Sequence, residues 1–215
     1  MRTLFSIILL ISTLTVLCQT NSESKGKWKV GVTISPDTYF NARSFSLTDV
    51  TGFGSIETSG FNFTSGLAAE WSINSNIDLV SGINFSRKDF SGIYYCSVCE
   101  FFMMPAREPI KVRIVEIPLF FRYNIFDKQL GVHLEAGITS GYLTNSMSST
   151  YTGNLSENKF QLSGLIGLGI NLDLGRRINL SLSSDIRQSF TNLIAGSDLK
   201  FRSVGFITGI TYKIN

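Results

Sequence analysis

Apolar and polar residues alternate along about eight segments of the chain. In the clearest segment, apolar residues occupy every second position from 132 to 138 and again 142, with small or polar residues between them. Because successive side chains of a strand point to opposite faces, this period of two predicts strands with one apolar face. The apolar residues of that segment are Val132, Leu134, Ala136, Ile138 and Tyr142. The same pattern occurs over 28–34, 61–73, 77–85, 115–125, 160–172, 178–190 and 204–214.

The connections between these segments alternate between long and short. Three are tight, at 74–76, 126–129 and 173–177. Outer-membrane barrels use short periplasmic turns and long external loops, and an even number of strands puts every short turn on the periplasmic side. The pattern therefore predicts an all-β fold, an eight-stranded antiparallel up-and-down transmembrane β-barrel with short periplasmic turns. Its four long external loops are expected at 35–60, 89–109, 143–158 and 191–202.

The alternative is a soluble, lipocalin-like binding barrel, in which the apolar faces would line the interior. The residues opposite the apolar positions are mainly Gly, Ser, Thr, Asn and Ala, with few long charged side chains. A sheet face in water usually carries many such charges, whereas small polar residues suit the interior of a narrow barrel. The composition therefore favours the membrane barrel.

Charged residues on the polar faces are nearly balanced between acids and bases. Such groups in an interior of low dielectric must be paired or hydrated. We therefore predict an internal polar network that fills the barrel. Its members are Lys29, Glu70, Asp78, Glu116, Arg122, His133, Glu135, Asp185, Arg187 and Lys213.

The amino-terminal segment resembles a secretion signal. Arg2 supplies a positive charge and an apolar stretch follows at 4–17, which predicts a signal peptide over 1–20 and a barrel domain over 21–215. The uncharged apolar stretch 160–172 is shorter than the ~20 residues that a spanning helix needs. The net charge of +3 is small, so nucleic acid is not expected as a partner. The expected location is the outer membrane.

Two runs of sequence carry a resemblance to a known family. The run EIPLFFRY at 116–123, preceded by LVSGINFSRK at 79–88, resembles the PorT-like outer-membrane β-barrel family of Bacteroidetes. The resemblance implies an eight-stranded outer-membrane barrel, and some members of that wider family act in protein secretion and surface export. Within the first run, Pro118 falls on the inward face, where it removes one ladder hydrogen bond and is a candidate position for a bulge.

The loop predicted at 89–109 contains two candidate features. Cys96 and Cys99 lie in a compartment that favours a disulfide, with free thiols as the alternative. A redox pair would need a helix after a strand, and a zinc site would need four ligands, while the single histidine lies near the other end of the barrel. No metal or cofactor is therefore expected. An apolar run in the same loop either covers the barrel mouth or forms a docking patch. It consists of Phe101, Phe102, Met103 and Met104.

The expected function is non-enzymatic. His133 and Glu135 share a strand face, but they are placed inward and far from the external rim, which does not suit attack on outer-leaflet lipid. We expect a monomeric surface-interaction or envelope and secretion component that acts through its external loops. Its expected partners are outer-membrane lipid and envelope or secretion proteins. Arg87 is expected either near the lipid headgroups or in a solvated position. A lipid-modifying outer-membrane enzyme is the alternative.

Overall fold

The computed structural model describes residues 27–40, 51–58, 62–96, 106–125, 130–147, 158–174, 177–192 and 200–214. The strands are β1 (Trp28–Phe40), β2 (Thr51–Thr58), β3 (Asn62–Ser72), β4 (Ile77–Cys96), β5 (Ala106–Asn124), β6 (Leu130–Met147), β7 (Phe160–Leu174), β8 (Ile178–Ser189) and β9 (Arg202–Ile214). Over these ranges, no helix is long and apolar enough to cross a membrane.

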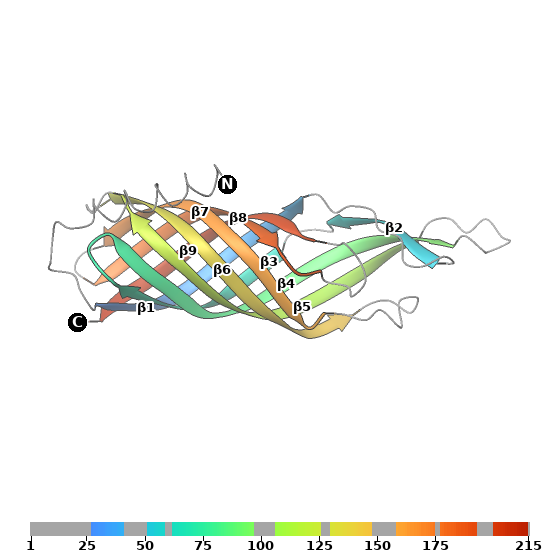
Figure 1. Ribbon diagram of the computed structural model, residues 1–215, viewed down its shortest axis with the longest axis horizontal. Coiled ribbons are helices and arrows are strands. Elements are labelled where there is room, and N and C mark those ends of the chain that lie inside the picture. Colours follow the sequence, from blue (N-terminus) through green and yellow to red (C-terminus); the bar gives the residue numbers. More distant parts are fainter. Residues whose placement is uncertain are drawn as a thin grey trace, which may run out of the picture.

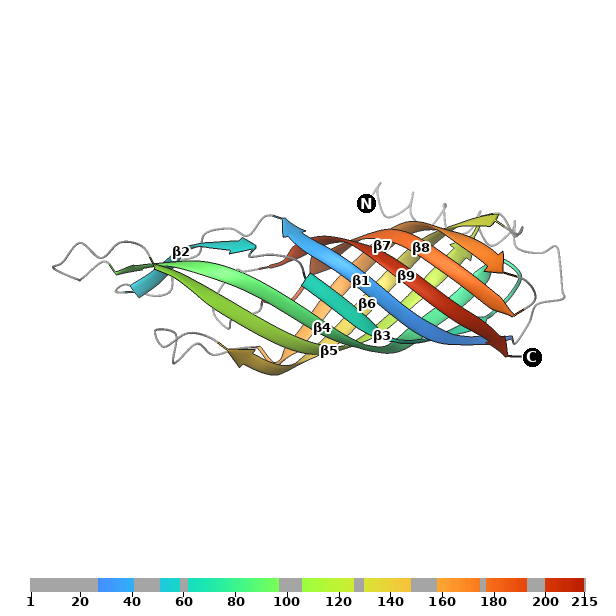
Figure 2. The same cartoon turned by 180° about the vertical axis from the view of Figure 1, so that it is seen from behind.

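Eight of these strands close into a barrel. Each pairs with its neighbours in the antiparallel sense, in the order β4, β3, β1, β9, β8, β7, β6, β5, and β5 pairs with β4 to complete the ring. Figure 1 and Figure 2 show the tilted strands crossing on the two sides of this barrel. A closed barrel leaves no free sheet edge in its wall, which is what the hydrocarbon of a membrane requires. The prediction of an eight-stranded antiparallel barrel is confirmed.

A ninth strand lies outside the barrel wall. β2 pairs with the outer part of β4, from Thr58 opposite Phe90 to Thr51 opposite Cys96. It falls within 35–60, which the sequence predicted to be a loop. The expected loop 89–109 is also mostly wrong, because β4 continues to Cys96 and β5 begins at Ala106. β1 and β6 likewise run into the expected loops. Strand pairing beyond the bilayer needs no apolar face, so the alternation that marked the membrane segments does not mark these extensions.

The apolar faces point outward and the polar faces point inward. Ile166 is 71% exposed and Leu67 is 65% exposed, whereas His133 is 0% exposed. A soluble barrel would have the reverse arrangement, since it must bury its apolar side chains from water. The soluble, lipocalin-like alternative is therefore wrong for this chain. The outward apolar surface is a lipid-facing belt.

Small residues let the inward side chains fit. A Cβ atom built on Gly169 would lie 2.4 Å from Nε2 of His133 and 2.7 Å from the carbonyl oxygen of Leu182. On Gly205 it would lie 2.8 Å from Oδ1 of Asp185 and 3.2 Å from Cβ of Asp37. At both positions, glycine makes room for a charged or polar side chain of the neighbouring strand.

Pro118 interrupts strand pairing without shifting it. It is buried on the inward face, and the β4–β5 pairing resumes in the same register on either side, with Ser81 opposite Leu119 and Asn84 opposite Glu116. Oγ of Ser81 donates a hydrogen bond to the carbonyl oxygen of Pro118 at 2.9 Å. The predicted bulge at Pro118 is therefore wrong. The register shift of β5 occurs instead at Arg113, against β6.

Aromatic side chains lie at the end of the barrel that carries the short turns. Trp28 and Trp71, on paired strands, stack with ring centroids 6.1 Å apart. Nη1 of Arg177 donates to the hydroxyl of Tyr212 at 2.7 Å. Aromatic rings with a polar edge favour the border between hydrocarbon and water, so these residues mark the periplasmic border of the belt.

Candidate functional sites in the polar interior and at the external end

A central cluster of three charged side chains crosses the barrel interior. Arg122 on β5 donates from Nη1 to Glu70 on β3 at 2.5 Å and from Nε to Glu135 on β6 at 2.8 Å. All three side chains are almost inaccessible to solvent. Because an isolated buried charge is very costly, these charges are tolerated only as a paired set. Arg122 thereby joins β6, its neighbour in the wall, to β3, which lies beyond β4 on the other side.

A second set of contacts continues towards the short turns. Nζ of Lys29 lies 3.2 Å from Oε2 of Glu70 and 3.2 Å from Oδ2 of Asp78. Nearer the barrel end, Nζ of Lys213 contacts Oδ2 of Asp173 at 2.8 Å. Lys29 therefore connects the central cluster to the periplasmic part of the interior.

A third set lies towards the external end. Arg187 donates from Nε to Asp185 at 2.5 Å and from Nη2 to Oγ of Ser35 at 3.2 Å. Its Nη1 lies 3.9 Å from Oε2 of Glu116, which is a looser ion pair. The structure thus places every residue of the predicted network on the inward face and brings these residues together in linked groups.

Sequence reasoning missed one buried ion pair of this interior. Lys88 on β4 donates from Nζ to Oδ2 of Asp37 on β1, and both side chains are nearly inaccessible. Asp37 fell in an expected loop, and Lys88 follows the last apolar residues of its segment. The usable signal was the alternation itself, which continues on the inward face from Lys29 through Ser35 to Asp37. Asp173 was missed for a similar reason, because it was assigned to a turn.

His133, Glu135 and Ser183 lie together but do not have the geometry of a catalytic triad. Nε2 of His133 lies 3.1 Å from Glu135 and 3.3 Å from Oγ of Ser183, while its Nδ1 is buried without a hydrogen-bond partner. In a triad, the carboxylate binds Nδ1 and leaves Nε2 for the hydroxyl. All three residues are at most 1% exposed. They are better described as part of the internal polar network.

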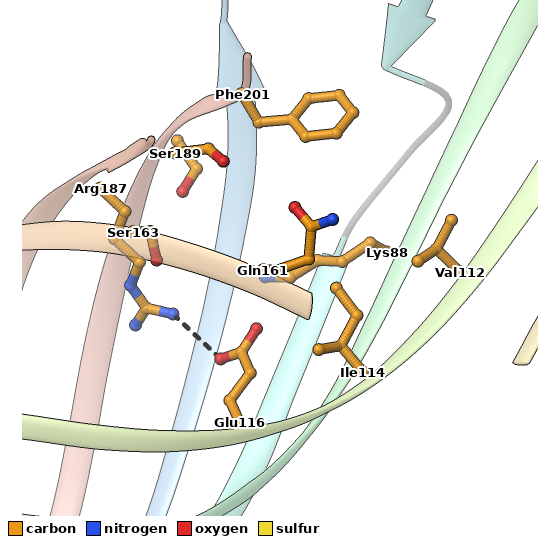
Figure 3. A pocket seen from close by; sticks show the side chains of 10 residues that line it. Lys88, Val112, Ile114, Glu116, Gln161, Ser163, Arg187, Ser189 and Phe201 are labelled. Atoms are coloured by element: carbon orange, nitrogen blue, oxygen red, sulfur yellow. Dashed lines mark ion pairs between the residues drawn. The ribbon is translucent and has the colours of Figure 1, made fainter. Parts of the chain in front are cut away.

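A pocket opens at the external end of the interior (Figure 3). It encloses about 560 Å³ of empty space, part of it open solvent. Figure 3 shows the Arg187 and Glu116 side chains facing each other across it, with Gln161, Lys88 and Phe201 on the surrounding wall. A deeper space of about 640 Å³, again including open solvent, is also lined by Arg187 and Glu116. This ion pair therefore lies at the boundary between the two spaces.

The other predicted site residues lie largely outside the described residues. Of the two cysteines, Cys96 ends β4 and its backbone pairs with Thr51, while Cys99 is outside. The proposed docking patch, Phe101, Phe102, Met103 and Met104, and the predicted signal peptide 1–20 are outside as well. Among the described side chains, no group of three or more His, Cys, Asp or Glu is arranged to hold a metal ion. The disulfide and the docking patch stay predictions.

The external end carries a small sheet that extends past the barrel. It consists of β2 with the outer parts of β4 and β5, and we call it the external sheet. β4 has 20 residues and β5 has 19, compared with 11 in β3 and 12 in β8. Figure 1 and Figure 2 show these three strands projecting beyond the other barrel strands. The extra length of β4 and β5 forms a platform outside the membrane.

The chain is similar to several solved outer-membrane barrels, and OprG shares its fold. OprG from Pseudomonas aeruginosa matches with a TM-score of 0.57 and 7% identity, over 90% of this chain and 98% of that chain. Outer membrane protein AlkL in lipid bilayers matches with a TM-score of 0.49 and 13% identity, over 92% of this chain and 94% of that chain. Ail of Yersinia pestis, solved with a heparin analogue, matches with a TM-score of 0.48 and 12% identity, over 88% of this chain and 99% of that chain. Because its identity is so low, the OprG match shows the fold alone.

The family assignment comes from the sequence. No curated protein matches the chain significantly. Residues 17–195 match the family described as outer membrane protein beta-barrel domain, which covers most of the chain. The family, the closed barrel with its outward apolar belt and the similarity to OprG together place the protein in the outer membrane. This chain belongs to the outer membrane protein beta-barrel domain family.

Proposed function

We propose that this protein is a non-enzymatic surface component of the outer membrane that binds an envelope or secretion protein through its external end. The observation that carries the proposal is the external sheet. A strand needs about 9–11 residues to cross a membrane at the usual tilt. β4 and β5 are about twice that length, so roughly half of each strand extends beyond the belt.

A projecting sheet is well suited to binding a protein. Extended chains add to exposed strands through backbone hydrogen bonds, and side chains on alternate positions supply specificity. β2 extends the sheet by one strand on the side of β4, which widens the surface available to a partner. A sheet of this size serves no purpose in crossing the membrane, which favours a role in recognition.

The barrel interior supports the non-enzymatic part of the proposal. The charged side chains of its central cluster are paired across the lumen and nearly inaccessible, and His133 lacks the triad geometry described above. The alternative, a lipid-modifying enzyme, needs a nucleophile and a base within reach of lipid at the external rim. His133 and Glu135 do not meet that condition.

The resemblance to PorT-like proteins supports an envelope or secretion role. The two runs that carry it, 79–88 and 116–123, lie on β4 and β5 and face each other across a paired ladder. These strands are the same ones that extend to form the external sheet. The two runs that resemble PorT-like proteins therefore belong to the strands that carry the external sheet, to which we assign binding.

The test is a trimmed variant in which residues 91–109 are replaced by Asn-Gly. This change joins Phe90 directly to Ile110, its partner in the ladder, through a two-residue hairpin turn. A deletion strain would carry either the full chain or the trimmed variant, and quantitative mass spectrometry would measure the proteins exported to its surface. We expect the trimmed variant to fold into the membrane and to show the same changed surface proteins as the deletion.

The matched control removes residues 150–155, between β6 and β7, and is expected to restore the surface proteins. Full restoration by the trimmed variant would contradict the proposal, as would a deletion strain with unchanged surface proteins. Lipid acylation would be measured in the same strains. A loss of one acyl chain in the deletion, restored by the trimmed variant, would support the enzyme instead.

A further inference from the structure

Two arginines lie directly opposite each other on the outer surface of the barrel. Arg87 on β4 and Arg113 on β5 are paired in the ladder, and both belong to the outward face. Directly paired side chains on one face of an antiparallel sheet are close neighbours, and like charges in that arrangement repel. Two guanidinium groups at such a position call for an explanation.

The arginine pair lies at the external border of the lipid-facing belt. On β4, the outward residues up to Phe85 are mostly apolar, and Arg87 is the next outward position. On β5, the outward residues from Tyr123 back to Val115 are apolar, and Arg113 is again the next. Each apolar stretch is about nine residues, the length that crosses the hydrocarbon. The guanidinium groups therefore lie at the level where outer-leaflet headgroups begin.

One carboxylate holds the two guanidinium groups together. Arg87 contacts Oδ2 of Asp89 from Nε at 2.8 Å and from its Nη2 at 2.7 Å. Arg113 donates from Nη1 to Oδ1 of the same carboxylate at 3.0 Å. Lys111 is exposed and lies opposite Asp89 in the ladder. Two arginines thus contact one acid, a lysine lies opposite it in the ladder, and the patch remains positively charged.

The patch keeps donors available for a ligand. A guanidinium group has five N–H donors, and Asp89 engages only some of those on Arg87 and Arg113. The Arg87 side chain is 58% exposed, so an ion pair there contributes little to stability. Planar guanidinium groups match the geometry of phosphate oxygens through paired hydrogen bonds.

We propose that Arg87, Arg113 and Lys111 form a binding site for the phosphate group of an outer-leaflet lipid. Asp89 holds the two arginines close together, so that one ligand can be reached by N–H groups of both. The lipid tails would lie along the apolar surface of β4 and β5 below them, where Phe85 is 64% exposed. This site is independent of the protein-binding function proposed for the external sheet, because it lies at the membrane border of the same strands.

The test measures binding of dihexanoyl phosphatidic acid, a lipid with a phosphate headgroup, to the full chain folded in a neutral detergent. Native mass spectrometry would give the dissociation constant for the unaltered protein and for Arg87→Gln/Arg113→Gln. Because charge-assisted hydrogen bonds are the strong ones, we expect binding to weaken about tenfold or more. Inorganic phosphate is expected to compete only at far higher concentration.

The matched control is Lys159→Gln/Lys200→Gln, which removes the same charge from exposed positions just before β7 and β9. It is expected to bind as the unaltered protein does. Equal weakening in both double variants, or none in the arginine variant, would overturn the proposal. Competition by inorganic phosphate at the same concentration as the lipid would also overturn it. If the glutamine variant does not fold, Arg87→Lys/Arg113→Lys keeps the charge and is expected to show an intermediate loss.

Discussion

Arg122 donates a hydrogen bond to Glu135 at 2.8 Å in the centre of the barrel, where neither side chain is more than 5% exposed. The same guanidinium group reaches Glu70 on β3. One arginine therefore pairs with two buried carboxylates from different parts of the wall, and Lys29 supplies a second positive charge beside Glu70. This arrangement fixes the distance between β3 and β6 across the interior, and it explains how a narrow barrel can contain so many charges.

Replacing Arg122 with methionine should strongly destabilise the barrel. The substitution keeps much of the side-chain volume but leaves Glu70 and Glu135 without their shared partner. Removing one member of a buried ion pair costs ~3–5 kcal/mol. The measurement is the free energy of unfolding in urea for protein folded in phospholipid vesicles.

The control for Arg122→Met is Lys213→Met, because the Lys213–Asp173 pair is about 30% exposed. An ion pair with that exposure contributes at most about 1 kcal/mol. If the two variants lose the same free energy of unfolding, the central cluster does not have the structural role assigned to it.

Gly169→Ala should destabilise the wall of the barrel. The new methyl group would lie 2.4 Å from the His133 ring and 2.7 Å from a backbone oxygen, so β7 or the ring must shift. Overpacking of this kind costs ~1–3 kcal/mol. Gly167→Ala is the milder comparison, since its nearest contact would be at 3.1 Å. Equal urea midpoints for the two alanine variants would argue against close packing at Gly169.

An arginine in the middle of the lipid-facing belt should be costly. Ile166 is the most exposed of the large apolar residues that the structure describes, and it lies near the middle of β7. A charged side chain at the bilayer midplane costs ~2–4 kcal/mol, and near the border only ~0–1 kcal/mol. Ile166→Arg should therefore lose much more unfolding free energy in vesicles than Leu174→Arg, at the end of the same strand. Similar losses of unfolding free energy in the two variants would contradict the position of the lipid-facing belt, with Ile166 at its middle and Leu174 at its border.

The disulfide expected between Cys96 and Cys99 is tested by mass spectrometry of the native protein. An oxidised pair lowers the mass by two hydrogens and leaves neither thiol able to react with a maleimide until a reductant is added. Labelling of both cysteines without reductant would favour the free thiols.

The membrane part of the fold could be predicted from sequence because lipid imposes a strict pattern. Every second residue of β1 from Trp28 to Ile34 must be apolar, and the structure places all of these side chains outward. The inward face could be predicted too. Charged residues such as Lys29, Arg122 and Glu135 all stand at positions that alternate with the apolar ones, which assigns them to the opposite face of each strand. Within these segments, hydrocarbon requires apolar residues on the outer side of each strand and the interior accommodates polar residues on the inner side, so the sequence pattern reports both faces.

The external end could not be predicted in the same way. Beyond the bilayer, strands such as β2 and the outer half of β4 have no hydrocarbon on one side, so alternation is no longer required. Asp37 and Lys88 lie at this transition, where the apolar face ends but the barrel interior continues. Their ion pair forms because β3 pairs with both β4 and β1 and so brings these two strands together. A local sequence pattern does not specify which strands pair.

The orientation of the barrel supports both the binding function and the lipid site, and cysteine labelling on intact cells tests it most directly. Cys18, Cys96 and Cys99 would first be replaced by serine, and one new cysteine would then be introduced in each variant. Ser91→Cys places it in the outer part of β4, and Ser75→Cys places it in a short turn. A membrane-impermeant maleimide should label Ser91→Cys on intact cells and Ser75→Cys only after the outer membrane is permeabilised. Labelling of Ser75→Cys alone on intact cells would contradict the account.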